Sequence, residues 1–340
     1  MPRWENGGRM VIIITGGAGF IGSCVVAGLE RAGYEGTVVV DWLGDGEKWK
    51  NIAKRNLFDI VSPEELDTFL VKYCSEIDAV IHMGAISTTT EKDADKFVQN
   101  NIRLTWNLWE YCRNNNKRFI YASSAATYGA GENGFDDDDS PEYLNRLRPL
   151  NPYGWSKAFI DRKVAGIVAT GEKHRLPPQY AGLKFFNVYG PNEYHKEGQK
   201  SVIAHIFPKV KNDEPVPLFK SYNPNYEDGG QLRDFVWVED IADITLWLLE
   251  NPKVSGLFNV GSGEARSFVD LARAVWQAMD KTPKITYIDM PEGLRGQYQY
   301  YTQASISKLR AAGYAKEMTR LEDGVGMYVR DFLNRDDQYL

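Results

Sequence analysis

Cysteine and histidine are scarce in this chain. Its 340 residues include three cysteines and four histidines, and Cys24, Cys74 and Cys112 are far apart in the sequence. No Cys-x-x-Cys pair and no paired histidine supplies the ligand spacing of a metal site. We therefore predict no bound metal, and we expect all three thiols to be reduced and buried.

Long apolar runs and an excess of positive charge are also missing. Residues 1–9 are polar and glycine-rich, and the apolar run after them is too short for a signal peptide or a membrane helix. The formal net charge of −6 argues against a nucleic-acid surface, and the acidic run 136–139 is typical of a solvated loop. We expect a cytoplasmic protein that binds neither nucleic acid nor membrane, with residues 1–9 as an N-terminal extension.

The composition that is present, 43% hydrophobic and 25% charged, is ordinary for a folded protein of one or two domains. Apolar runs typical of buried strands alternate with helical patterns in the first half, which favours a parallel sheet. We predict strands at 10–15, 38–41, 79–82, 118–122, 182–186, 233–238 and 256–261. We predict helices at 20–29, 63–74, 100–114, 153–169, 239–251, 267–279 and 303–313, and an exposed loop at 220–232.

This pattern predicts an α/β fold, a Rossmann-type doubly wound parallel sheet with a smaller, mostly C-terminal α/β lobe for substrate. The alternation loosens after about residue 187. We expect residues 10–186 and about 234–263 to form the NAD(P)-binding lobe. About 187–233 and 264–335 then form the substrate-binding lobe.

A glycine-rich turn follows the first predicted strand. Gly16, Gly19 and Gly22 lie where a strand meets a helix, and their missing side chains let a pyrophosphate approach the amides at the helix N-terminus. The second strand ends in Asp41, about twenty residues on, where a ribose-binding acid is expected. A solvated turn acid is the alternative for Asp41.

Ser124, Tyr153 and Lys157 have the order and spacing of a proton-transfer site. Residues four apart share a helix face, so Lys157 can reach toward Tyr153 or a cofactor beside it. A tyrosine pKa is about 10, and we expect the ammonium, helped by an oxidised nicotinamide, to lower it toward neutrality. Ser124 would hydrogen-bond the substrate oxygen that exchanges the proton.

Five motifs, spread in order over almost the whole chain, carry a family resemblance. They are 16–22 (GGAGFIG), 123–129 (SSAATYG), 153–157 (YGWSK), 187–191 (NVYGP) and 233–236 (RDFV). The chain resembles the extended short-chain dehydrogenase/reductases that act on nucleotide sugars. Segments 87–91, 121–129, 193–196 and 298–303 are similar to one branch of that family, epimerases that invert C6 of an ADP-linked heptose for the lipopolysaccharide core.

The resemblance implies transient oxidation at C6 by a tightly bound cofactor, followed by return of the same hydride to the other face of the aldehyde. Tyr153 and Lys196 match the family's two acid/base groups, and Ser124 and Lys157 complete the catalytic set. His195 could replace Lys196 in that role, and the alternative for Lys196 is a solvated loop cation. An ordinary lysine is a poor base at pKa about 10.4, so Lys196 needs burial or positive neighbours.

Two further residue sets are carried over by the resemblance. The cofactor set is Gly16, Gly19, Phe20, Ile21, Gly22, Asp41, Trp42, Lys48, Gly84, Ala85, Ile86, Ser87, Asn100, Lys157 and Val188. The substrate set is Ser87, Ser124, Asn187, Gly198, His205, Phe219, Arg233 and Tyr298, of which His205 could instead be a packed histidine.

The chain departs from the family pattern at several of these places. Trp42 stands where asparagine is frequent, Pro63 where a cation is expected, Gly198 where a serine is expected, and Lys184 where arginine is usual. The family implies NADP, with Lys48 as the remaining cation for its 2′-phosphate, but NAD is possible because Asp41 would repel that phosphate. The family also implies a homo-oligomer, often a pentamer.

Three alternatives remain. A nucleotide-sugar 4,6-dehydratase usually has an Asp-Glu pair directly after the catalytic Ser/Thr, whereas this chain has Ala125 and Ala126. A UDP-hexose 4-epimerase differs chiefly at Lys196 and the 298–303 segment. An NAD(P)-sensing binding protein would not need the complete Ser124, Tyr153 and Lys157 set.

Overall fold

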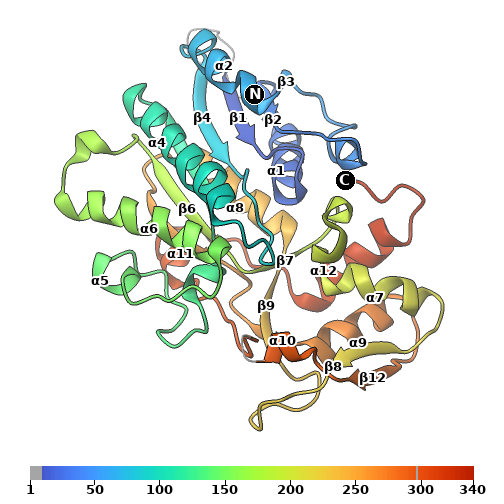
Figure 1. The fold of residues 1–340 in the computed structure, drawn as a ribbon. Helices are drawn as coiled ribbons and strands as arrows, with labels where there is room; N and C mark the ends of the chain where they lie inside the picture. The colour runs from blue at the N-terminus through green and yellow to red at the C-terminus, as the bar shows by residue number, and fades with distance from the viewer. Residues whose placement is uncertain (1–9, 296–297) are drawn as a thin grey trace.

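A seven-stranded sheet forms the centre of the larger lobe (Figure 1). The computed structural model describes residues 10–295 and 298–340, so the expected extension at 1–9 lies outside the described part. The strand order is β10-β6-β5-β4-β1-β2-β3, and every neighbouring pair is parallel. This is the Rossmann order with one further strand beside β6, and the predicted fold class is confirmed.

The strands of the large sheet are short and, apart from the edge strand β3, almost wholly buried. They are β1 (Val11–Thr15), β2 (Thr37–Val40), β3 (Asp59–Val61), β4 (Ile77–His82), β5 (Arg118–Ser124), β6 (Tyr180–Phe185) and β10 (Gly256–Val260). A three-stranded sheet contains β7 (Asn187–Tyr189), β9 (Leu232–Trp237) and β11 (Ala265–Ser267), and β8 (Val216–Phe219) pairs with β12 (Ile285–Ile288).

The α-helices are α1 (Phe20–Arg31), α2 (Leu66–Lys72), α3 (Ala94–Phe97), α4 (Leu104–Asn114), α5 (Pro141–Leu144), α6 (Pro152–Thr170), α7 (Val202–Lys211), α8 (Val238–Glu250), α9 (Phe268–Ala278), α10 (Glu292–Arg295), α11 (Ser307–Ala311) and α12 (Leu321–Met327). The 3₁₀ turns are η1 (Lys48–Asn51), η2 (Pro63–Glu65), η4 (Ala125–Tyr128), η5 (Lys173–Arg175) and η6 (Tyr194–Gln199), and the π-helical segments are η3 (Val98–Arg103) and η7 (Tyr328–Leu333). Among the described helices, none has the length and apolar character required to cross a membrane.

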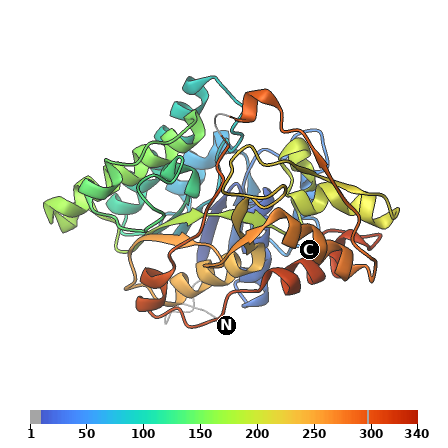
Figure 2. The same ribbon diagram turned by 90° about the horizontal axis from the view of Figure 1, so that it is seen from below.

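Helices cover both faces of the large sheet because successive strand residues point to opposite sides. Ile12 and Ile14 pack with α1 and α8, whereas Val11 and Ile13 pack with α2, α4 and α6. Figure 2 shows α4 and α6 on one side of the strands and α1 and α8 on the other. The beginnings of α1 and α6 therefore approach the carboxyl edge of the sheet from opposite faces.

The smaller lobe has its own apolar core. Side chains of α7, β8, β9, α9, α12 and η7 form one buried cluster. Of these elements, α7, β8, α9 and α12 lie at the lower right of Figure 1. Strand β9, part of which we expected in the larger lobe, pairs with β7 and β11 instead, while α8 and β10 return to the large sheet. The division into two folding units stays a prediction.

Several local predictions need correction. The helix expected at 303–313 is α11 alone, at 307–311, and the helix expected at 100–114 begins as the π-helical η3. The acidic run 136–139 is not simply solvated, because Asp137 is 4% exposed and accepts a 3.1 Å hydrogen bond from the Asn259 amide. Cys24 and Cys112 are buried, but Cys74 is partly exposed.

Candidate active site

A cavity of about 900 Å³ lies at the carboxyl ends of the parallel strands. Its wall includes Thr15 at the end of β1, Asp41 after β2, Met83 after β4, Ser124 at the end of β5 and Asn187 after β6. Ligands of open α/β sheets bind at this edge, and the volume is near the upper end of ordinary ligand sites.

The glycine turn fits a phosphate-bearing ligand. Gly16 has φ +67°, and a Cβ there would lie 2.5 Å from the amide nitrogen of Gly84. A Cβ on Gly22 would lie 2.1 Å from the Gly16 carbonyl oxygen. Helix α1 follows directly, its N-cap is Gly19, and no side chain caps it among the described residues. Its first amides therefore face the cavity free to bind an anion.

A carboxylate and an ammonium occupy the end of β2. Asp41 accepts a 3.0 Å hydrogen bond from the Ala18 amide and forms a 2.6 Å ion pair with Lys48. The same Lys48 ammonium donates to the Trp42 carbonyl oxygen, and the Trp42 indole donates to Glu64 at 2.8 Å. Asp41 is thus held in place rather than solvated, and acidic, basic and aromatic groups meet at this end of the cavity.

Ser124 and Tyr153 meet where β5 ends and α6 begins. Asn151 caps α6 through a 2.8 Å bond from the Gly154 amide, and Pro152 occupies the first turn, where its missing N–H costs nothing. Burial raises the pKa of Tyr153, and hydrogen bonding with Ser124 opposes this rise. Without a cofactor the Tyr153 pKa is thus raised rather than lowered, and its lowering by Lys157 together with an oxidised nicotinamide stays a prediction.

Lys157 is 3% exposed and donates a 2.8 Å hydrogen bond to the Ala122 carbonyl oxygen. Burial lowers the pKa of Lys157 to about 8, and the negative charge of Asp161 opposes that shift. Beneath it, burial and the Lys157 charge lower the pKa of His82 to about 3, so His82 is neutral. Its ring nitrogens lie 2.6 Å from the Thr15 hydroxyl and 2.8 Å from the Thr105 hydroxyl.

Lys196 reaches the cavity from the opposite face of the sheet. It belongs to η6, and its Nζ lies 5.3 Å from the centroid of the Phe20 ring at the start of α1. Burial lowers the pKa of Lys196, as its predicted acid/base role requires, while the negative charge of Glu193 opposes the shift. Burial also lowers the pKa of the neighbouring His195 to about 4.

Two sets of contacts hold the Lys196 segment. Buried Glu193 accepts hydrogen bonds from the Ser201 hydroxyl at 2.6 Å and the Tyr328 hydroxyl at 2.8 Å. The segment 337–340 lies against the other side (Figure 1). There the Tyr194 hydroxyl donates to the Gln338 carbonyl oxygen at 2.9 Å, and the Leu340 amide donates to Asn192 at 3.0 Å.

The cavity brings most of the predicted residues together. All fifteen residues of the predicted cofactor set and all four of the predicted catalytic set line it, as do Ser87, Ser124, Asn187 and Gly198 of the substrate set. His205, Phe219, Arg233 and Tyr298 do not. The individual roles of these residues stay predictions.

The four residues outside the lining differ in their surroundings. His205 is exposed on α7, and Phe219 is half-buried at the end of β8. The Arg233 guanidinium lies 5.2 Å from the Tyr298 ring centroid and 5.7 Å from that of Phe268, which does line the cavity. Arg233 and Tyr298 therefore stand together beside the Phe268 end of the cavity.

Sequence reasoning missed several residues at the site. Thr89, Thr90 and Lys200 line the cavity. The first two belong to the 87–91 segment that carries the family resemblance, which could have predicted them. Lys200 is four residues after Lys196, and this spacing could have predicted it. Buried Asn101 had no comparable signal: it donates to the Ile86 carbonyl oxygen at 2.9 Å and to the Ser156 hydroxyl at 3.0 Å, which joins the turn after β4 to α6.

Fold and cavity together indicate an enzyme that uses a nicotinamide cofactor. Residues 12–261 match the NAD dependent epimerase/dehydratase family, and the chain belongs to this family. Over nearly its whole length it is similar to the ADP-L-glycero-D-manno-heptose-6-epimerase of Fusobacterium nucleatum subsp. nucleatum, with 48% identity over 340 residues, 97% of this chain and 100% of that protein.

Solved structures agree with this placement. The ADP-L-glycero-D-manno-heptose-6-epimerase of Helicobacter pylori has a TM-score of 0.74 and 27% identity, covering 95% of this chain and 96% of that chain. The UDP-glucose 4-epimerase of Thermus thermophilus, in complex with NAD, has a TM-score of 0.70 and 26% identity, covering 93% and 97%. The resemblance derived from the motifs is confirmed at the level of the family.

Proposed function

We propose that this chain is an isomerase that interconverts ADP-D-glycero-D-manno-heptose and ADP-L-glycero-D-manno-heptose by transient oxidation at C6. The observation that carries the proposal is one cavity with Ser124, Tyr153 and Lys157 on the α6 side and Lys196 on the α1 side. Epimerisation removes a proton from the C6 oxygen and returns one after the carbonyl has turned its other face to the hydride, and this arrangement supplies an acid/base group for each orientation. Similarity to heptose epimerases supports the substrate.

The residues that would hold the cofactor are the glycine turn, the first amides of α1, and Asp41 with Lys48. When bound there, an NAD-type cofactor supplies a reversible hydride acceptor. Tyr153 or Lys196 accepts the proton of the C6 hydroxyl as that oxygen becomes a carbonyl, and the group on the other face donates a proton when the alcohol re-forms. Ser124 orients the substrate oxygen toward Tyr153, and Lys157 holds positive charge beneath it.

An assay of the complete enzyme tests the function. Purified protein is mixed with ADP-D-glycero-D-manno-heptose, the C6 configuration is followed by NMR, and UDP-glucose serves as the comparison substrate. We expect conversion of the heptose without added coenzyme and without net reduced nicotinamide, because the hydride returns to the carbon that it left. Stoichiometric accumulation of reduced nicotinamide would favour a dehydrogenase. Conversion of UDP-glucose alone would favour a 4-epimerase.

The same preparation identifies the cofactor, which we propose to be NADP. Lys48 is the ammonium beside Asp41 at the cavity wall, so Lys48→Ala should weaken NADP binding much more than NAD binding. Isothermal titration with each cofactor measures this difference. Equal losses for the two would show that Lys48 does not contact the 2′-phosphate. The expected homo-oligomer and cytoplasmic location stay predictions.

A further inference from the structure

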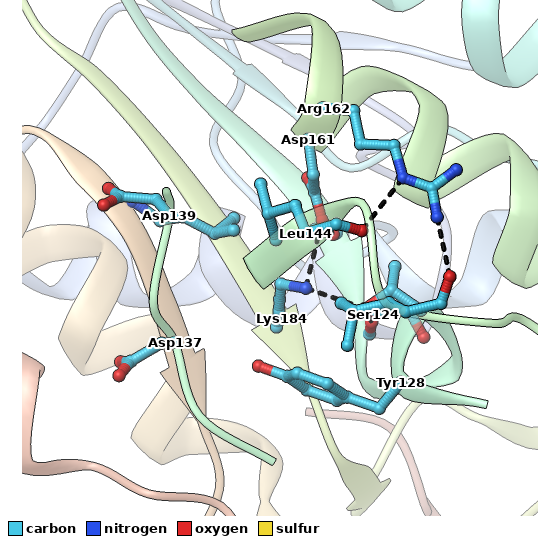
Figure 3. A network of polar contacts seen from close by, with 12 residues as sticks. Ser124, Tyr128, Asp137, Asp139, Leu144, Asp161, Arg162 and Lys184 are labelled. Atoms are coloured by element: carbon cyan, nitrogen blue, oxygen red, sulfur yellow. Dashed lines mark hydrogen bonds and ion pairs between the residues drawn. The ribbon is translucent and has the colours of Figure 1, made fainter. Parts of the chain in front are cut away.

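A buried ion pair lies behind the Ser124 side of the cavity. Lys184 of β6 is 0% exposed, Asp161 of α6 is 2% exposed, and Lys184 Nζ lies 3.3 Å from Asp161 Oδ2. Figure 3 shows the two side chains pointing toward each other, with the Tyr128 ring beside them. The Lys184 ammonium lies 4.3 Å from that ring centroid.

The pair contacts the chain on both sides of Ser124. The Ser123 hydroxyl donates a 2.7 Å hydrogen bond to Asp161, and Ser123 directly precedes Ser124. On the other side, Lys184 donates to the Thr127 hydroxyl at 2.8 Å, and that hydroxyl donates to the Ser124 carbonyl oxygen at 2.8 Å. The end of β5 and the first turn of η4 are thus held by opposite ends of one ion pair.

Asp161 also acts on Lys157, one helical turn before it. Its negative charge opposes the burial that lowers the pKa of Lys157. Within the described part of the chain, the other titratable groups around Lys157 carry no compensating negative charge. They are neutral His82 of β4, the Tyr153 phenol on the same helix, the Tyr121 phenol of β5, whose pKa burial raises, and the Lys184 ammonium of β6. Asp161 is therefore the carboxylate that favours the ammonium form of Lys157.

Stability alone is a weak explanation for such a pair, because desolvation of two buried charges can exceed their attraction. Its contacts point to a local role instead. We propose that Asp161 and Lys184 form a positioning pair for the catalytic step, fixing Ser124 beside Tyr153 and placing a carboxylate one helical turn from Lys157. The inference rests on the proposed function where it is tested by kcat and KM. The titration of Lys157 tests it without any turnover.

The test compares Asp161→Asn, Lys184→Met and Lys184→Arg with a matched control. Asp78 and Arg118 form a largely buried ion pair between β4 and β5 at the opposite end of these strands, so Asp78→Asn also removes a carboxylate that links elements of the sheet. Each variant is measured for Tm, for kcat and KM across pH, and for the titration of the Lys157 ε-carbon by NMR with labelled lysine.

We expect Asp161→Asn and Lys184→Met to lower kcat by roughly 10–10²-fold, as for other small displacements of reacting groups, with KM nearly unchanged. In Asp161→Asn, Lys157 should lose its proton at lower pH than in the wild type, and the alkaline decline of kcat should shift in the same direction. Lys184→Arg should retain most of the activity. Asp78→Asn should lower Tm without changing kcat or the titration.

If Asp161→Asn behaves like Asp78→Asn in kcat and leaves the Lys157 titration in place, the pair is only structural and the inference is overturned. If Asp161→Asn does not fold, Ser123→Ala replaces it. That variant removes only the 2.7 Å contact, and an unchanged kcat in it would also count against the inference. A wild type that is inactive on every nucleotide sugar would overturn the proposed function instead, and the titration would still decide the role of Asp161.

Discussion

The two sides of the cavity are built differently. Tyr153 and Lys157 lie on α6, a helix of 19 residues that packs on the large sheet, and the groups behind them are buried. Lys196 lies on η6, a 3₁₀ segment of 6 residues in which Glu197 has φ +48°. The first side is fixed by the core, whereas the second depends on side-chain contacts from Glu193 and from the segment 337–340.

The difference indicates how substitutions should act. On the α6 side, a change behind the site should alter stability as well as chemistry, because the same buried groups serve both. On the η6 side, loss of a contact should chiefly displace Lys196, since a short 3₁₀ segment held by a few side-chain contacts moves at little cost to the global fold. The following predictions test this contrast.

The largest effects are expected from the two acid/base residues themselves. Tyr153→Phe and Lys196→Met should each lower kcat by roughly 10²–10⁴, the usual span for a positioned acid or base, with smaller changes in substrate affinity. Steady-state kinetics with the heptose nucleotide measure both. If Lys196→Met epimerises at a near-native rate while Tyr153→Phe is inactive, a single tyrosine serves both faces and Lys196 is a loop cation.

A smaller effect is expected from Glu193→Gln, which keeps the shape but removes the charge beside Lys196. Since Glu193 raises the pKa of Lys196 against burial, this pKa should fall in the variant, and kcat should drop about tenfold as Ser201 and Tyr328 lose their acceptor charge. The pH profile of kcat/KM measures the shift, and Lys196→Met identifies which limb belongs to the lysine. A limb that does not move would contradict the electrostatic link.

The α6 side should be sensitive to acid through His82. Its folded pKa of about 3 lies below the unfolded value of about 6.5. Its contribution to stability is therefore complete above pH about 6.5 and lost as the pH falls toward 3. Between pH 7 and 5 this loss is about 2 kcal/mol of unfolding free energy. In His82→Gln, the free energy of unfolding measured with urea should depend less on pH by this amount. His174→Gln should show no such change, because His174 is exposed.

The smallest effect is expected from Tyr339→Ala. The Tyr339 ring lies 5.3 Å from the Tyr194 ring, edge to face, and its loss should displace η6 and lower kcat about threefold to tenfold with little change in Tm. Tyr73→Ala is the matched control, because Tyr73 also makes an edge-to-face ring contact, at 5.8 Å from Phe58, but lies at the C-cap of α2 rather than against η6. Equal kcat values for the two variants would show that the segment 337–340 does not position Lys196.

The parts that the sequence predicts well are those where a local rule decides the outcome. The run 10–15 and the glycines after it can form little other than a buried strand and a tight turn, so the phosphate-binding end of the cavity is predictable. The meeting of Ser124, Tyr153 and Lys157 in one site is likewise predictable, because Ser124 ends a strand and residues four apart share a helix face.

The remaining parts depend on contacts between distant residues. Lys157 donates its hydrogen bond to the Ala122 carbonyl oxygen, and burial raises the pKa of Tyr153. Both results depend on how deeply the two side chains are buried, which their spacing in the sequence does not reveal. The acids around Asp137 predict a solvated side chain, yet it is buried and accepts a hydrogen bond from the Asn259 amide, more than a hundred residues away. The placement of His205, Phe219 and Arg233 outside the cavity lining is set by the packing of the smaller lobe, for which the chain offers only family likeness.

The contacts of the segment 337–340 have a consequence for how the protein is made. These contacts join the segment to Tyr194, Asn192 and Lys54, which lie 144, 148 and 285 positions earlier in the chain than their partners. On the ribosome, the N-terminal elements emerge and begin to fold first, so the glycine turn and the Tyr153 helix can form while the chain is still being synthesised. The Lys196 side acquires its last contacts only when residue 340 has left the exit tunnel, and a nascent chain should therefore bind cofactor before it can epimerise.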